Sequence, residues 1–149
     1  MFRGHYEHAI DEKGRTSLPS RFRDVLTGAD EARLVVTPAL GDPCLDVYPL
    51  GAWEALEGKL AHLNAFDAEV IEFRRFYVSA AVECELDKQG RILVPPSMRE
   101  HAGMGKNVLW LGHGQKAELW ARERWEQLSA QKSADDLRAL RAAMGRLGL

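Results

Sequence analysis

The sequence predicts a mostly β protein with short helices (an α+β fold), because one motif occurs twice and helical spacing is confined to the segments after each copy. The first copy begins at residues 11–15 (DEKGR) and the second at residues 87–91 (DKQGR), so Asp, Gly and Arg recur at an offset of 76. Such a recurrence indicates an internal duplication rather than a catalytic motif. The same offset relates a proline and a second arginine in each copy, Pro19 and Arg23 to Pro95 and Arg99.

Each copy opens with a tight turn. Asp at the first position and Gly at the fourth of Asp-x-x-Gly are typical of a type I turn closed by a left-handed residue. Asp11 and Gly14 form this pair in the first copy, and Asp87 and Gly90 form it in the second. We predict that each turn joins two strands of a β-hairpin and places an arginine just after the tip.

The rest of each copy reads as strand, short helix and two further strands. A proline follows the apolar runs 16–18 and 92–94 and stands near the first position of a brief helix, which ends near Gly28 or Gly103. Strands are then expected at 34–36 and 45–48, joined by a turn at 41–43, with counterparts at 108–111 and 118–120.

Between the copies the apolar residues recur at helical spacing, which predicts two amphipathic linker helices. Ordinary core packing is the default explanation of such stripes. One helical face carries Trp53, Leu56, Leu60 and Leu63, and the other carries Val70, Phe73 and Tyr77.

The C-terminal segment predicts one more helix. Ser133 and Asp136 have the spacing of a reciprocal N-terminal cap. The helix that follows carries an apolar stripe and is either an oligomer contact or a loosely held tail. The stripe consists of Leu137, Leu140, Met144 and Leu147.

The two copies are expected to complete one pseudo-symmetric domain, because a unit below about 60 residues buries too little apolar surface to be stable alone. We divide the chain into a first repeat (1–51), a helical linker (52–80), a second repeat (81–124) and a C-terminal helix or tail (125–149).

Composition places the chain among soluble globular proteins, with 149 residues of which 46% are hydrophobic. No apolar run approaches the roughly 20 residues that a membrane helix needs, so no membrane partner is expected. The N-terminus lacks the apolar stretch of a secretory signal, which favours a cytoplasmic location. Cys44 and Cys84 lack metal-ligand spacing, and we expect no disulfide, metal or cofactor.

Charge is informative only locally, since the formal net charge is −2. The window 13–23 contains four basic residues and no acidic one, whereas the matching window 89–99 contains only two basic residues. Basic side chains on turns suit a phosphate backbone, because each neutralised phosphate releases counterions. Surface arginines also serve solubility alone, so charge by itself is a weak indication of nucleic-acid binding.

No enzyme is predicted. The chain has five histidines and two cysteines, but it has no His-Glu-x-x-His or Cys-x-x-Cys spacing and no glycine-rich phosphate loop. His5 and His8 would lie on opposite faces of a strand. A Cys–His nucleophilic pair is the only catalytic arrangement left open.

Several segments together resemble the MraZ family. The resemblance extends from Met1 to about Leu128, and its specificity comes from the order, spacing and duplication of the motifs. The segments are Met1-Phe2-Arg3-Gly4, Asp11-x-x-Gly14-Arg15 with Pro19 and Arg23, Cys44-Leu45 before Tyr48-Pro49, and Asp87-x-x-Gly90-Arg91.

The resemblance implies two SpoVT-AbrB swapped-hairpin motifs in an AbrB-like barrel and a ring-shaped homo-oligomer. It implies a DNA-binding transcriptional regulator, mainly a repressor, that is cytoplasmic and associated with the nucleoid and has no small-molecule substrate. The target would be double-stranded DNA with short direct repeats, in the promoter of the division and cell-wall gene cluster that includes its own gene. The alternative is an interaction module of the antitoxin type, which binds DNA with one face and a partner protein with a tail.

Arg15 is the first candidate for DNA contact, because its planar fork can engage a phosphate or a guanine edge. The competing interpretation is an ion pair with Asp11 across the turn. Lys13, at the tip, is the candidate for a non-specific phosphate contact. Further DNA-binding candidates in the first copy are Arg21, Arg23 and Arg3, and auxiliary DNA-binding or structural candidates in the second copy are Lys88, Arg91 and Arg99.

Overall fold

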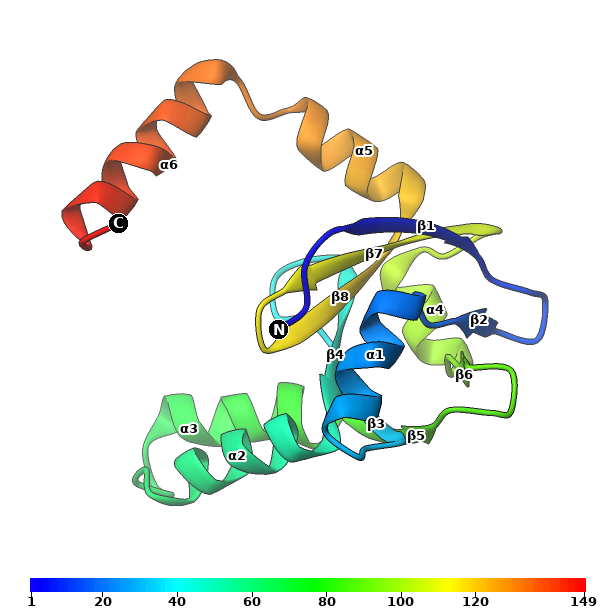
Figure 1. Ribbon diagram of the computed structural model, residues 1–149. Helices are drawn as coiled ribbons and strands as arrows, with labels where there is room; N and C mark the ends of the chain where they lie inside the picture. Colours follow the sequence, from blue (N-terminus) through cyan, green and yellow to red (C-terminus); the bar gives the residue numbers. More distant parts are fainter.

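Both copies contribute strands to one shared sheet in the computed structural model, which describes all 149 residues (Figure 1). The elements in chain order are β1 (His5–Ala9), β2 (Arg15–Ser17), α1 (Ser20–Gly28), β3 (Arg33–Pro38), β4 (Cys44–Pro49), α2 (Leu50–Ala61), α3 (Ala68–Phe73), the π-helical turn η1 (Arg74–Val78), β5 (Val82–Glu85), β6 (Arg91–Leu93), α4 (Pro96–Ala102), β7 (Asn107–His113), β8 (Lys116–Ala121), α5 (Arg122–Ala130) and α6 (Ala134–Arg146).

The strand order reveals the duplication. Six strands form one antiparallel sheet in the order β1-β7-β8-β4-β3-β5, and β2 pairs with β6 in a separate two-stranded ribbon. Exchanging each strand of the first copy with its counterpart in the second reverses this order and leaves every pairing intact. The two copies are therefore related by a pseudo-twofold axis, which crosses the ribbon at the Thr16–Ile92 pair. The sheet has two free edges, β1 and β5.

The predicted hairpin between β1 and β2 is reduced to a single bridge, Ile10–Thr16. Beyond it the strands diverge, because β1 pairs along its full length with β7, whereas the three residues of β2 pair with β6. The hairpin prediction was therefore correct for the turn and wrong for the strand partners.

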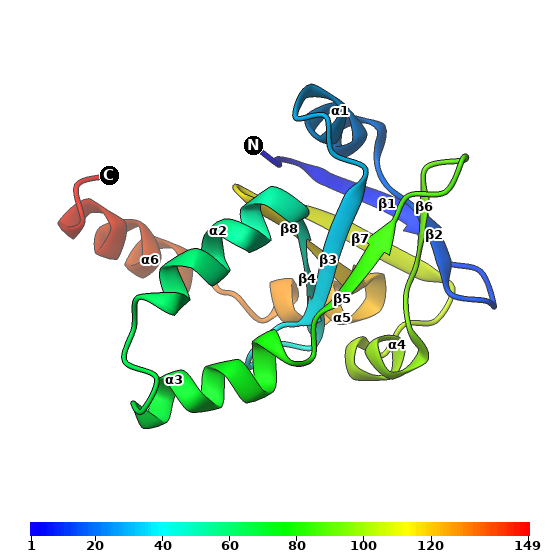
Figure 2. The ribbon, with the colours of Figure 1, turned by 90° about the horizontal axis from the view of Figure 1, so that it is seen from below.

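One face of the sheet forms the main core. The ribbon and the helices α1 and α4 cover this face (Figure 2). Phe22 on α1 is 1% exposed and meets the rings of Phe2, Tyr6 and Trp110 edge to face. A proline in extended conformation precedes each of these two helices, Pro19 before α1 and Pro95 before α4. Each proline is the N-cap residue, so the helix begins one residue later than the sequence predicted.

The other face is covered by helices that follow each copy. Trp53 of α2 and Tyr77 of η1 pack on Val35. Trp125 and Leu128 of α5 pack on a second apolar cluster around Trp120. Helices α2 and α5 thus occupy equivalent places, and Trp53 and Leu56 of α2 recur as Trp125 and Leu128 of α5 at an offset of 72.

Helices form in the linker and after Ser133 as predicted, whereas the helix α5 before Ser133 was not predicted. The end of the first linker helix also differs. Leu63 was assigned to the apolar face of the first linker helix, but α2 ends at Ala61 and Leu63 is 54% exposed. Ser133 caps α6 reciprocally with Asp136, and no residue of α6 is buried. None of the helices combines the length and the apolar character needed to cross a bilayer.

Candidate nucleic-acid interface

The first turn orients its arginine through Asp11. The Asp11 Oδ1 atom accepts hydrogen bonds from the backbone N–H groups of Lys13 at 3.0 Å and Arg15 at 2.8 Å. The Oδ2 atom accepts from Arg15 Nε at 2.7 Å. The ion pair considered for Arg15 is therefore present, and it occupies only one edge of the guanidinium group.

The second turn repeats this geometry. Asp87 accepts from the backbone of Gln89 and Arg91 at 2.9 Å each, and from Arg91 Nε at 2.8 Å. Each distance differs from its counterpart in the first turn by 0.1 Å. The structure thus gives Arg15 and Arg91 equivalent hydrogen bonds to the turn aspartates.

Hydrogen bonding keeps both aspartates ionised. The Arg15 backbone N–H, more than its guanidinium, holds the pKa of Asp11 below its ordinary value, and Arg91 does the same for Asp87. A lowered carboxyl pKa stabilises the turns at pH values above about 3.8, and this contribution is lost as the pH falls through the folded-state pKa. Both arginines therefore stay oriented throughout the neutral range.

Each turn is held by the other copy. The carbonyl of Gly14 accepts from the backbone N–H of Val94 at 2.8 Å, and the carbonyl of Gly90 accepts from that of Leu18 at 2.9 Å. Arg99 of the second copy also reaches the first turn, where its Nη1 donates to the Glu12 carbonyl at 3.5 Å. This interlocking fixes the two turns relative to one another at one edge of the molecule (Figures 1 and 2).

Two of the candidate arginines, Arg23 and Arg99, pack against the turns. A Cβ on Gly90 would be 2.5 Å from Arg23 Nη1, and a Cβ on Gly14 would be 2.8 Å from Arg99 Nε. The second arginine of each copy thus packs against the turn of the opposite copy. Arg23 and Arg99 therefore hold the turns in position.

Replacing Gly14 by alanine is expected to lower the free energy of unfolding by about 2–4 kcal/mol. The residue has φ +89°, and an added Cβ would lie 2.7 Å from the Val94 carbonyl oxygen. Gly41→Ala is the matched control, because Gly41 has φ +83° but no atom within 4 Å of the added Cβ. Urea unfolding should show that Gly41→Ala costs about 1–2 kcal/mol. Equal losses in the two variants would contradict the interlocking of the turns.

The remaining candidates lie in two places. Lys13 and Lys88 are exposed on the two turns. Arg3 and Arg21 line a separate hollow together with Asp24. The structure therefore gathers the turn residues and leaves the N-terminal pair apart from them.

The charge difference between the copies disappears when each turn is counted whole. Residues 11–23 contain four basic and two acidic residues, and residues 87–99 contain three basic and one acidic residue, so both carry +2. The comparison of residues 13–23 with residues 89–99 began after Asp11 and Glu12 in the first copy and after Lys88 in the second. Neither charge nor geometry ranks Arg15 above Arg91.

The ribbon adds residues that sequence reasoning did not include. Since Thr16 and Ile92 point into the core, their neighbours Ser17 and Leu93 share the outer face with the two arginines. Leu93 is 56% exposed. The alternation of side chains along a strand was the signal that identifies this face.

Cys44 is not available as the cysteine of the Cys–His nucleophile that the sequence left open. Cys44 is fully buried, and its sulfur lies beside carboxylates of Asp46 and Glu118. Burial, reinforced by these carboxylates, raises the pKa of the Cys44 thiol far above neutral. The thiol is therefore protonated and inaccessible.

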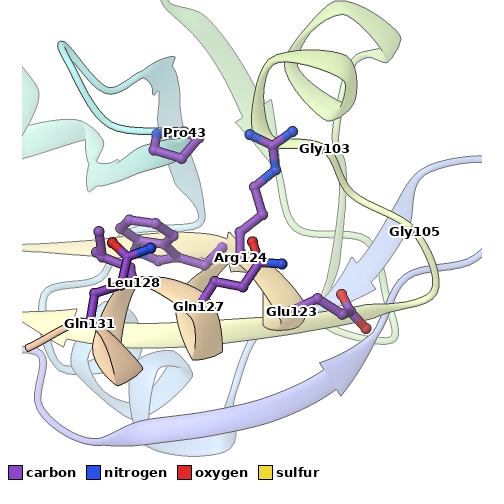
Figure 3. A pocket seen from close by; sticks show the side chains of 9 residues that line it. Pro43, Gly103, Gly105, Glu123, Arg124, Gln127, Leu128 and Gln131 are labelled. Atoms are coloured by element: carbon purple, nitrogen blue, oxygen red, sulfur yellow. The ribbon is translucent and has the colours of Figure 1, made fainter.

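A broad surface hollow of about 640 Å³ lies between α5 and the loop after α4 (Figure 3). Figure 3 shows Arg124 reaching over Gly103, and a Cβ at Gly103 would lie 2.6 Å from Arg124 Nε. The side chain thus fills the space left by the glycine at the end of α4. None of the candidate arginines or lysines lines this hollow.

Comparison with known proteins gives consistent matches over most of the chain. The family described as "MraZ protein, putative antitoxin-like" matches twice, at residues 1–76 and 77–146. A "Transcriptional regulator MraZ" of Heliobacterium modesticaldum is 50% identical over 127 residues, 85% of each chain. The protein of the same name from Moorella thermoacetica is 43% identical over 144 residues, 97% of this chain and 96% of that one. That from Pelotomaculum thermopropionicum is 45% identical over 134 residues, 90% and 89% of the two chains.

Proposed function

Since this chain belongs to the MraZ family of transcriptional regulators, we propose that it binds DNA sequence-specifically and acts mainly as a repressor. The observation that carries the proposal is the ribbon of β2 and β6, whose outer face presents Arg15 and Arg91 in equivalent positions. The turns beside this face are held in place by hydrogen bonds between the copies.

Asp11 and Asp87 orient Arg15 and Arg91 for DNA contact. Each arginine uses Nε for the carboxylate and leaves its two terminal amino groups without a protein partner. These groups can bind a phosphate or the O6 and N7 atoms of guanine. Lys13 and Lys88, exposed on the adjoining turns, supply contacts to the DNA backbone. Arg23 and Arg99 act through the turns that they hold.

The proposed target is a set of short direct repeats in the promoter of the division and cell-wall gene cluster, including the protein's own gene. This target follows from the family resemblance. The protein would work in the cytoplasm, associated with the nucleoid.

We also propose that several copies form a ring. One copy offers two arginines and two exposed lysines, which bind few phosphates. Neighbouring copies on tandem repeats act at high effective concentration, which raises the overall affinity without any new type of contact. The exposed apolar residues on α6 and around α2 and α3 support association between copies.

A binding assay with one or two repeats tests this function. Fluorescence anisotropy should show that a duplex with two direct repeats from upstream of the gene binds at least about 10²-fold more tightly than a duplex with one. A duplex of the same length with one repeat shuffled is the control. Equal affinity for all three duplexes would contradict sequence-specific multivalent binding.

An antitoxin-type module is the second candidate, favoured by the family description and by the unburied α6. This candidate predicts that the protein alone binds the duplex weakly and that a partner protein bound to the tail restores affinity. The same assay with purified protein alone distinguishes the two functions.

A further inference from the structure

An apolar groove runs between the two linker helices. It has a volume of about 420 Å³ and is lined mainly by Leu56, Leu60, Leu63, Val70 and Phe73. Leu63 is 54% exposed at its end, so this groove presents apolar surface that the chain itself does not cover.

A complementary apolar stripe lies on α6. Leu137 and Leu140 are 55% and 56% exposed, and Leu147 just after the helix is 75% exposed. With Met144 they follow the i, i+3, i+7 spacing that places side chains along one helical face. An isolated helix of 13 residues is marginally stable in water, so a partner that covers the stripe would stabilise α6.

The charges of the two surfaces are also complementary. The segment 50–73, which forms the groove, contains five acidic residues and one lysine. Beyond its first turn α6 contains three arginines and no acidic residue. Arg141 is adjacent to the stripe. Glu69 and Lys59 line the groove itself, and the other four acidic residues of the segment lie outside its lining. Opposite charges beside an apolar contact fix its orientation and disfavour other partners.

Within one copy the two surfaces stay apart. Figure 1 shows α6 and the α2–α3 hairpin leaving the body as separate arms. Helix α5 is anchored on the sheet through Trp125 and Leu128, and only residues 131–133 separate it from α6. Three residues span at most about 10 Å, which limits how far α6 can move.

We propose that α6 of one copy docks in the α2–α3 groove of a second copy. The contact is heterologous, because the stripe and the groove belong to different elements, and heterologous contacts that close generate rings. This inference rests on the proposed association between copies and names the surfaces that make it.

Light scattering and sedimentation of the full-length protein test the contact with three variants. Leu140→Gln alters the stripe and Leu63→Gln alters the groove, whereas Ala142→Gln lies on the opposite side of α6 as the matched control. We expect the dissociation constant between copies to rise at least about tenfold in the first two variants and to stay unchanged in the control. Circular dichroism verifies that each variant is folded. If the wild type assembles and both leucine variants assemble equally well, the inference is overturned while the proposed ring stands. A monomeric wild type would overturn both.

Crosslinking decides between a second copy and the same chain. In a Cys84→Ser background, one preparation carries Leu140→Cys and another carries Leu63→Cys, and the two are mixed and treated with a short bis-maleimide. We expect a crosslinked pair that contains one chain of each kind. A third preparation carries both Leu140→Cys and Leu63→Cys in one chain. A crosslink within that chain, with none between the mixed single variants, would show that α6 occupies its own groove and would overturn the inference.

Discussion

Replacing Arg15 or Arg91 by alanine is expected to weaken binding to the upstream DNA about tenfold or more for each change, and the double variant is expected to lose specific binding. An arginine that binds a guanine edge bidentately discriminates by about 1–3 kcal/mol, and an assembled protein makes this contact through every copy. The losses should be similar, because each arginine is held by its aspartate with distances that agree to within 0.1 Å. Fluorescence anisotropy with the two-repeat duplex measures them.

Arg75→Ala is the control for general loss of positive charge, since Arg75 is exposed on η1 and away from the ribbon. It should change the affinity by less than about threefold. Retained binding in the double variant, with the protein folded and assembled, would contradict the ribbon as the DNA surface. Loss in Arg15→Ala alone would show that the first copy dominates, as the sequence originally indicated.

Replacing Asp46 by alanine is expected to lower the free energy of unfolding by about 3–5 kcal/mol. Asp46 is 3% exposed, and its carboxylate accepts from Tyr77 Oη at 2.5 Å and pairs with Lys116 Nζ at 2.7 Å. Burial acts to lower the pKa of Lys116, but the bond and charge of Asp46 outweigh it and raise this pKa above its ordinary value. Without Asp46 the ammonium group is left without its counter-ion.

The conservative variant Asp46→Asn separates charge from hydrogen bonding. It keeps an acceptor for Tyr77 but removes the negative charge, so its loss should be smaller than that of Asp46→Ala. Urea unfolding followed by circular dichroism measures both variants. A loss below about 1 kcal/mol in Asp46→Ala would show that this buried network does not tie η1 to the sheet.

Local features of the fold could be predicted because they depend on residues close in sequence. The turns at Gly14 and Gly90, the helix starts near Pro19 and Pro95 and the cap at Ser133 all follow from short motifs. The pairing of strands could not be predicted in the same way. It depends on contacts between residues about 76 positions apart, such as Thr16 with Ile92, which a hairpin pattern does not encode.

The candidate site shows the same division. Sequence reasoning identified both turn arginines and foresaw the ion pair with Asp11. It did not show that Arg23 and Arg99 cross to the turn of the opposite copy, because that contact requires the fold. The apparent excess of charge in the first copy came from a window that began inside the turn, and a count from the first residue of each turn removes it.

A salt titration of binding by the purified wild-type protein tests the central claim most directly. The duplex from upstream of its own gene is compared with a shuffled duplex of the same composition at several salt concentrations. We predict that the upstream duplex binds at least about 10³-fold more tightly and that log affinity falls with log salt by about 0.9 for each phosphate neutralised. Equal affinity for the two duplexes, or no binding at low salt, would contradict a sequence-specific DNA-binding regulator.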